Sequence, residues 1–235
     1  MSCRLNALSS LLLCCLWSLP AAASPMIFTD RSDWNAAVAG WDVTIEDFEG
    51  FDADTPFSSG PVDVNSFEIV QFGGGSAPPN SNLIDVPPAE GNGLPIDLSS
   101  YVLGFANRGV GSDSDDRAVR LIFDAPIVGF GADFNAANGA SGLDILAVTE
   151  GGAQVFISGP QFDDVGFWGF VDDGGTLFSD IILFARTANA YGGGELFGMD
   201  NVSSASTPIP EPGTAALLGA GLAAFGLARR RRGRR

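Results

Sequence analysis

The sequence contains no histidine and no lysine, and its three cysteines, Cys3, Cys14 and Cys15, all lie within the first fifteen residues. If those residues are removed as a leader, the rest of the chain has no thiol, no imidazole and no disulfide. Zinc sites, haem ligation and Ser-His-Asp or Cys-His catalysis therefore lack their usual side chains. A bound metal ion would have to be a hard cation held by oxygen atoms.

Positive charge is also scarce between residues 24 and 207. This segment holds five of the twelve arginines and 27 of the 28 acidic residues, a net charge of −22. Such a surface repels the phosphate backbone of nucleic acids and attracts divalent cations. Nucleic acid is therefore not an expected partner.

The first 23 residues have the pattern of a removable signal peptide. Arg4 precedes an apolar run from Leu11 to Leu19, which leads into a small-residue motif that ends Ala21-Ala22-Ala23. A charged start, an apolar centre and an Ala-x-Ala site predict cleavage after Ala23. An uncleaved anchor is the alternative, but the run is shorter than the ~20 residues that a membrane span needs.

Residues 208–235 combine three elements: Pro210-Glu211-Pro212, an uncharged stretch from 213 to 228, and an arginine-rich end at 229–235. At ~1.5 Å per residue, a helix over the middle element would be about 24 Å long, short of the ~30 Å hydrocarbon core. Under the positive-inside rule the arginines stay in the cytoplasm and the preceding domain lies outside. These arginines are Arg229, Arg230, Arg231, Arg232, Arg234 and Arg235. A permanent single-pass anchor and a temporary one both remain open on this reasoning.

The order of these elements resembles the PEP-CTERM sorting signal of Gram-negative bacteria. The resemblance implies that an exosortase cleaves near Pro210-Glu211-Pro212 and releases the protein from a transient anchor in the inner membrane. It also implies an ectodomain that passes through the periplasm to the cell surface, where this family is associated with exopolysaccharide and biofilm matrix.

The middle segment, residues 24–207, predicts an all-β ectodomain. Asp30 can cap a short helix in which Trp34 and Val38 share a face and which Gly40 ends. The remaining pattern is short alternating strands separated by turns, which favours an antiparallel β-sandwich of jelly-roll type. The predicted strands are Val43–Glu49, Val62–Phe72, Ala118–Phe123, Ile127–Phe134, Leu143–Thr149, Ala153–Ser158, Val165–Val171, Asp180–Ala185 and Leu196–Val202. Residues 73–111, rich in Gly, Pro and Asn, predict a long loop, where binding function usually resides.

Two segments resemble the opening and closing signatures of carbohydrate-binding-module jelly rolls. They are Glu46-Asp47-Phe48-Glu49-Gly50 and Phe197-Gly198-Met199-Asp200-Asn201-Val202. The resemblance implies that first and last strands lie side by side and share a structural Ca²⁺ with Asp47, Glu49 and Asp200 as ligands. The alternative is that these carboxylates are solvated at strand ends.

No catalytic residue is predicted, because a chain with so many carboxylates always offers some pair at a glycosidase-like separation. We therefore expect a non-enzymatic protein of the cell surface or matrix. The alternative functions are a lectin-like carbohydrate-binding module and, less favoured, a glycoside hydrolase. Trp41, Trp168, Tyr101 and Tyr191 are candidates for stacking on sugars, although core packing is the commoner role of such residues.

Overall fold

The computed structural model describes residues 24–73, 81–86, 96, 99–106, 117–135, 142–160, 164–185 and 194–207. The predicted signal peptide at 1–23 and the C-terminal segment at 208–235 lie outside the described residues. Within the described part of the chain, no helix is long and apolar enough to cross a membrane.

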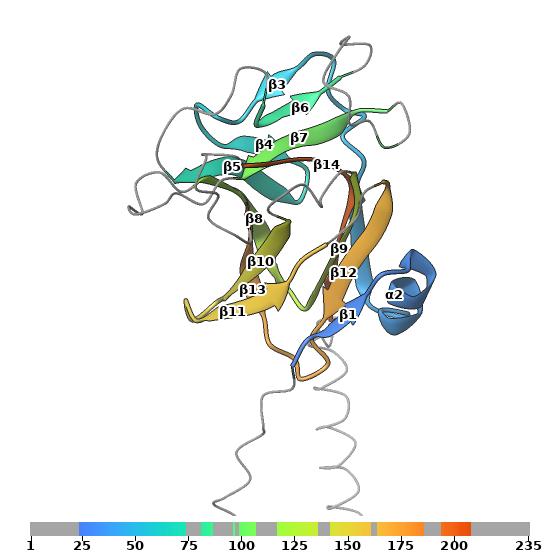
Figure 1. The fold of residues 1–235 in the computed structure, drawn as a ribbon. Coiled ribbons are helices and arrows are strands. Elements are labelled where there is room, and N and C mark those ends of the chain that lie inside the picture. The colour runs from blue at the N-terminus through green and yellow to red at the C-terminus, as the bar shows by residue number, and fades with distance from the viewer. Residues whose placement is uncertain are drawn as a thin grey trace, which may run out of the picture.

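One layer of the fold is an eight-stranded sheet (Figure 1). Its central strand is β14 (Glu195–Ser206), which pairs with β9 on one side. On its other side the first half of β14 pairs with β7, and the second half pairs with β2 (Asp42–Glu46). The strand order is β1 (Met26–Phe28), β12 (Gly166–Val171), β9 (Gly129–Asn135), β14, β7 (Tyr101–Ala106), β6 (Leu83–Asp85) and β3 (Thr55–Pro56).

The second layer is a six-stranded sheet that faces the first across the core. Its strand order is β11 (Gln154–Ser158), β10 (Leu143–Thr149), β13 (Phe178–Ala185), β8 (Arg117–Ile127), β5 (Phe67–Gly73) and β4 (Val62–Val64). Phenylalanine rings from both sheets meet between them, as in the edge-on contact of Phe170 with Phe178, whose centroids are 5.4 Å apart. Every pair of neighbouring strands in the described part of the chain is antiparallel, which confirms the predicted all-β sandwich.

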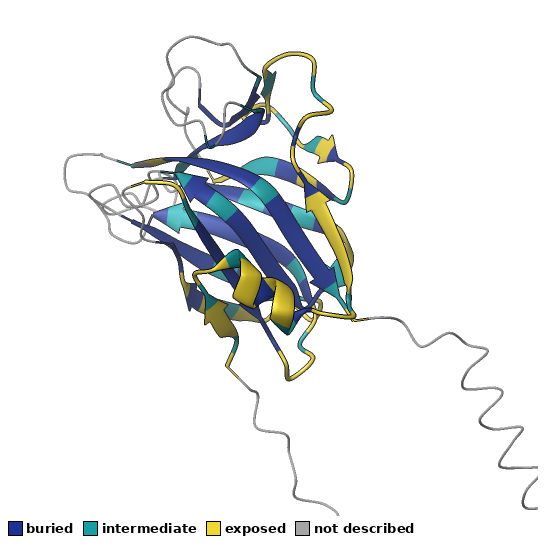
Figure 2. Ribbon diagram, turned by 90° about the vertical axis from the view of Figure 1, so that its right-hand side faces the viewer, coloured by how far each residue is buried: buried dark blue, intermediate teal, exposed yellow. Residues whose placement is uncertain are grey.

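The predicted helix is confirmed as α2 (Arg31–Ala37). Asp30 caps it by accepting hydrogen bonds from the backbone N–H groups of Ser32 and Asp33. The helix lies on the outer face of the eight-stranded sheet, with its polar side exposed (Figure 2). Trp34 is fully buried beneath it and donates its indole N–H to the carbonyl of Phe170 at 3.2 Å.

The loop predicted over residues 73–111 is wrong in two places, because β6 and β7 both lie within it. The apolar and β-branched side chains at Leu83-Ile84 and Tyr101-Val102-Leu103 favour strands. Their Gly- and Pro-rich surroundings dominate the local composition and hide that signal. The single strand predicted over Val62–Phe72 is also split, because a two-residue turn at Asn65-Ser66 separates β4 from β5.

The two ends of the domain leave the same end of the eight-stranded sheet. Met26 pairs with Val171, which pairs with Gly129, which pairs with Ala205. Because neighbouring strands lie about 4.8 Å apart, the two ends of this row are about 14 Å apart. The predicted signal peptide and the C-terminal segment 208–235 therefore connect to the same end of this sheet.

Candidate functional site

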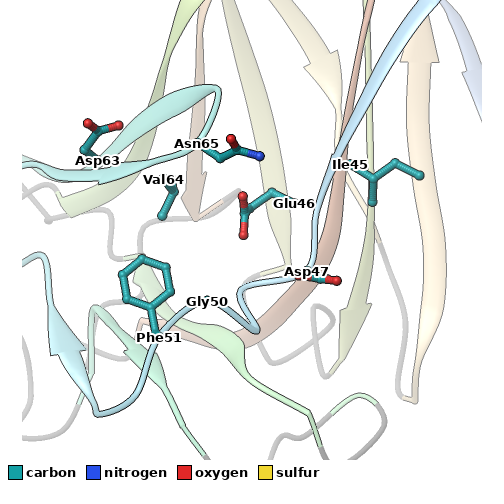
Figure 3. Close-up of a pocket in the computed structure, with 8 residues that line it drawn as sticks. All are labelled: Ile45, Glu46, Asp47, Gly50, Phe51, Asp63, Val64 and Asn65. Atoms are coloured by element: carbon teal, nitrogen blue, oxygen red, sulfur yellow. The ribbon is translucent and has the colours of Figure 1, made fainter.

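An open pocket of about 320 Å³ lies at the side of the sandwich where the edge strands β2 and β4 face one another (Figure 3). Its lining comes from two segments that are distant in sequence, 45–51 and 63–65. We call it the Glu46 pocket. Its lining residues are Ile45, Glu46, Asp47, Gly50, Phe51, Asp63, Val64 and Asn65.

The direction of the Glu46 side chain follows from strand register. Glu46 is the last residue of β2 and pairs with Val202 of β14, whose side chain belongs to the core. Paired residues point to the same face of a sheet, so Glu46 points between the two layers. Its side chain is buried although no arginine among the described residues lines the pocket.

Local hydrogen bonds hold the segment that follows β2. The backbone N–H of Phe48 donates to Oε1 of Glu46 at 2.8 Å, and the N–H of Glu49 donates to Oδ1 of Asp47 at 3.2 Å. Phe48 has a φ of 57° and is fully buried, so a left-handed turn places this ring in the core. The next turn brings Phe51 to the floor of the pocket.

The facing wall is the hairpin between β4 and β5. Asn65 stands in its two-residue turn with a φ of 49°, a conformation that asparagine tolerates better than most residues. The ring of Phe67 beyond the turn packs edge-on against Phe48 at 6.5 Å. This aromatic contact joins the two walls beneath the pocket.

The polar groups of the pocket are mainly hydrogen-bond acceptors. In Figure 3 the carboxylate of Glu46 and the amide of Asn65 point toward one another, with the Phe51 ring nearby, while Asp47 points away. Among the described residues, Oε2 of Glu46 has no hydrogen-bond partner. The arrangement suits a ligand that offers hydroxyl groups or a cation beside an apolar surface.

The three predicted calcium ligands do not all converge. Oε1 of Glu49 accepts from the backbone N–H of Ser100 at 2.7 Å, and Oδ2 of Asp200 accepts from the hydroxyl of Ser99 at 3.2 Å. One dipeptide thus brings two of the carboxylates together, whereas Asp47 is exposed and bonded to its own turn. Within the described ranges, no group of three or more acidic side chains could hold a metal ion. A structural Ca²⁺ stays a prediction.

The residues predicted to stack on sugars are mostly structural. Trp168 and Tyr101 are buried, and the Tyr101 hydroxyl donates to Asp85 at 2.9 Å. Trp41 is half-buried against the cluster around Trp34, and Tyr191 lies outside the described residues. The sequence reasoning missed Phe72 and Phe156, which expose 48% and 59% of their surface. In the sequence both residues look like core positions, and only their pairing in the sheet places them on the face opposite the core.

The C-terminal segment is identified by comparison with protein families. A family model described as the PEP-CTERM protein-sorting motif matches residues 208–232. The chain therefore carries a PEP-CTERM sorting motif. The motif marks an exported protein with a C-terminal membrane-anchoring signal that an exosortase processes, and it confirms the prediction made from Pro210-Glu211-Pro212 and the arginine tail.

Two solved structures that match part of the chain are carbohydrate-binding modules of family 29. A mutant of CBM29-2, from family 29, has a TM-score of 0.38 and 12% identity, covering 73% of this chain and 91% of its own. A second CBM29-2 mutant, complexed with mannohexaose, has the same TM-score and identity and covers 71% of this chain and 93% of its own. No curated protein sequence matches the chain.

Proposed function

We propose that this chain is a non-catalytic protein of a Gram-negative cell surface, sorted by an exosortase into the exopolysaccharide or biofilm matrix, where it serves a structural or adhesive role. The observation that supports this is the position of the sorting motif. Its match begins at residue 208, two residues after the end of β14 at Ser206. Cleavage near Pro210 would therefore remove the membrane anchor and leave the central strand intact.

Cleavage within β14 would have the opposite effect. This strand forms hydrogen-bonded pairs with β9, β7 and β2, and it contributes Phe197, Met199 and Val202 to the core. Loss of a central strand would expose core surface on both layers. The short segment between Ser206 and the sorting motif is therefore consistent with a domain that stays folded after its membrane anchor is cleaved off.

Mass spectrometry of the protein recovered from the cell surface tests the sorting step. We expect the mature form to begin at Ser24 and to end near Pro210. Replacement of Pro210, Glu211 and Pro212 by alanine should retain the arginine tail and leave the protein in the inner membrane, whereas Pro208→Ala serves as the control. Recovery of the intact arginine tail on the surface-resident protein would contradict the proposal.

A second candidate function is carbohydrate binding at the Glu46 pocket. The supporting observation is the meeting of the Glu46 carboxylate, the Asn65 amide and the Phe51 ring in one open pocket. Sugar hydroxyls can donate to the oxygens, while a sugar's apolar face can pack on the ring.

Affinity electrophoresis of residues 24–207 in gels that contain different polysaccharides tests this candidate. Asn65→Gly removes the amide and keeps a residue suited to the φ of 49°. We expect it to abolish retardation, while Asp42→Asn at the other end of β2 leaves retardation unchanged. Equal retardation of the wild type and Asn65→Gly, each measured relative to a gel without polysaccharide, would exclude binding at this pocket. Release of reducing sugar ends would instead favour a hydrolase.

A further inference from the structure

The outer face of the six-stranded sheet, opposite the core, carries large apolar side chains as well as polar residues such as Gln154 and Glu68. Phe156, Leu146 and Ile182 lie in one row of register across β11, β10 and β13. That row continues through Arg120 of β8 to Val70 of β5. The next row includes Phe184 and Phe72. We call this surface the phenylalanine face.

No described element covers the phenylalanine face. Helix α2 packs on the other sheet, against β12. The alternate residues of the same strands, such as Ile145, Leu121 and Ile69, are fully buried in the core. The sheet therefore carries large apolar side chains on both faces, and exposed apolar patches often mark an interaction site.

The polar groups at the centre of the face are already paired with one another. Arg120 donates from Nε to Oδ1 of Asp180 at 2.7 Å, and the Ser179 hydroxyl donates to the second carboxylate oxygen. The guanidinium also lies over the ring of Phe72, with its carbon 5.6 Å from the ring centroid. This cluster can be covered by an apolar partner without leaving the carboxylate unpaired.

We propose that the phenylalanine face binds the same face of a second copy of this chain, which deepens the proposed matrix function by providing cohesion between copies. Aliphatic side chains such as Val70 and Leu146 offer no hydrogen bonds to sugar hydroxyls, but they match an identical aliphatic surface. With a two-fold axis parallel to the middle strand β13, β11 of each copy lies over β5 of the other. Sheets packed face to face stand about 10 Å apart.

The charge distribution also favours this partner. The domain carries −22 between residues 24 and 207, so two copies repel one another over most of their surfaces. The centre of the phenylalanine face holds a neutral ion pair, Arg120 with Asp180. It is a surface on which two such acidic copies can approach closely.

The area sets the expected strength of the contact. Five strands about 4.8 Å apart, with three outward residues along each at about 6.8 Å spacing, cover roughly 24 Å by 20 Å. Burying this area on both copies removes about 1,000 Å² from water, near the lower bound of a specific interface. The dimer is therefore concentration-dependent rather than obligate.

Sedimentation velocity of residues 24–207 tests the proposal, since every described strand and both buried clusters lie within this segment. The mass should rise from one copy toward about two as protein concentration increases. The association should strengthen between about 0.1 M and about 1 M NaCl, because the Debye length falls from about 10 Å to about 3 Å and repulsion weakens. Cooperative thermal unfolding establishes that each sample is folded.

Phe156→Asp should give a mass of one copy at all concentrations, since this side chain is 59% exposed and its replacement leaves the core intact. Ile27→Asp is the matched control, because Ile27 is 48% exposed on β1, an edge strand of the other sheet, and this variant should associate as the wild type does.

A single-copy mass for the wild type at every concentration and salt would overturn the proposal. Dimerisation of Phe156→Asp would also overturn it. So would a monomeric wild type that binds polysaccharide and loses this binding in Phe156→Asp. The sorting proposal is tested separately, by the mass of the chain recovered from the cell surface. Failure of the dimer proposal is therefore distinguishable from failure of the sorting proposal.

Discussion

Gly104 provides the sharpest test of the fold, because it lies on β7, in the region for which the sequence predicts a loop. It pairs with Phe197 of β14 across the sheet. A Cβ atom built at residue 104 would lie 2.3 Å from Cζ of Phe197 and 2.7 and 2.8 Å from the two adjacent ring carbons. The ring is fully buried and packs against Phe134, with centroids 6.3 Å apart, so it cannot move aside freely.

We expect Gly104→Ala to reduce the free energy of unfolding by about 1–3 kcal/mol, the usual cost of overpacking a core. For a domain of this size each kcal/mol corresponds to a shift in Tm of about 2–4 °C, so Tm should fall by about 2–12 °C. Circular dichroism of residues 24–207 during heating measures this shift. Gly151→Ala is the control, because a Cβ atom built at residue 151 would lie 3.8 Å from the Thr149 hydroxyl, an ordinary contact distance.

A double variant identifies the clash as the cause. Phe197→Leu alone leaves a cavity and should destabilise the domain, but it also removes the ring atoms that the new Cβ would meet. The free-energy changes of Gly104→Ala and Phe197→Leu should therefore fall short of additivity by about 0.5–3 kcal/mol. Unchanged stability of Gly104→Ala, or strict additivity in the double variant, would refute the placement of β7 over Phe197.

Three further predictions concern helix α2 and the predicted calcium site at Asp200. The hydrogen bonds from Ser32 and Asp33 lower the pKa of Asp30. The Asp30 carboxylate therefore stabilises the fold above its unfolded pKa, and this stabilisation disappears as the pH falls through the lowered pKa. Asp30→Asn keeps the cap without titrating, so its free energy of unfolding in urea should lack this loss at acid pH. Trp34→Ala should lower the free energy of unfolding by about 3–5 kcal/mol, and calorimetry showing a smaller loss would mean that the cluster beneath α2 is not packed. Added Ca²⁺ should raise Tm in the wild type but not in Asp200→Ala, and the absence of any rise in the wild type would dispose of the calcium site.

Much of the β architecture was predictable, because a sheet with one buried face imposes a period of two on its sequence. The strands from 118 to 202 and the helix capped at Asp30 follow such local patterns, and all of them occur in the structure. β6 and β7 were not predicted because Gly- and Pro-rich segments surround them, and β6 is only three residues long. Their pairing partners lie far away in the chain, so β7 depends on β14 for its position.

The candidate sites show the same division. Glu46 and Asn65 meet only because the end of β2 and the turn after β4 face one another across the open side of the sandwich. Glu49 and Asp200 were predicted to converge, and the structure brings both to the Ser99-Ser100 dipeptide, but Asp47 turns to its own backbone instead. Nothing in the local pattern distinguishes these outcomes.

The sequence by itself determined that the chain is exported, because targeting signals are linear segments that enzymes and membranes recognise without tertiary partners. Pro210-Glu211-Pro212, the apolar stretch and the arginines suffice for that conclusion. Only the tertiary structure decided which apolar side chains lie on the surface of the folded domain. The outward apolar rows of the six-stranded sheet, with Phe72 and Phe156, look in sequence like core positions, because apolar side chains are expected inside. Strand pairing alone shows that they lie on the face opposite the core.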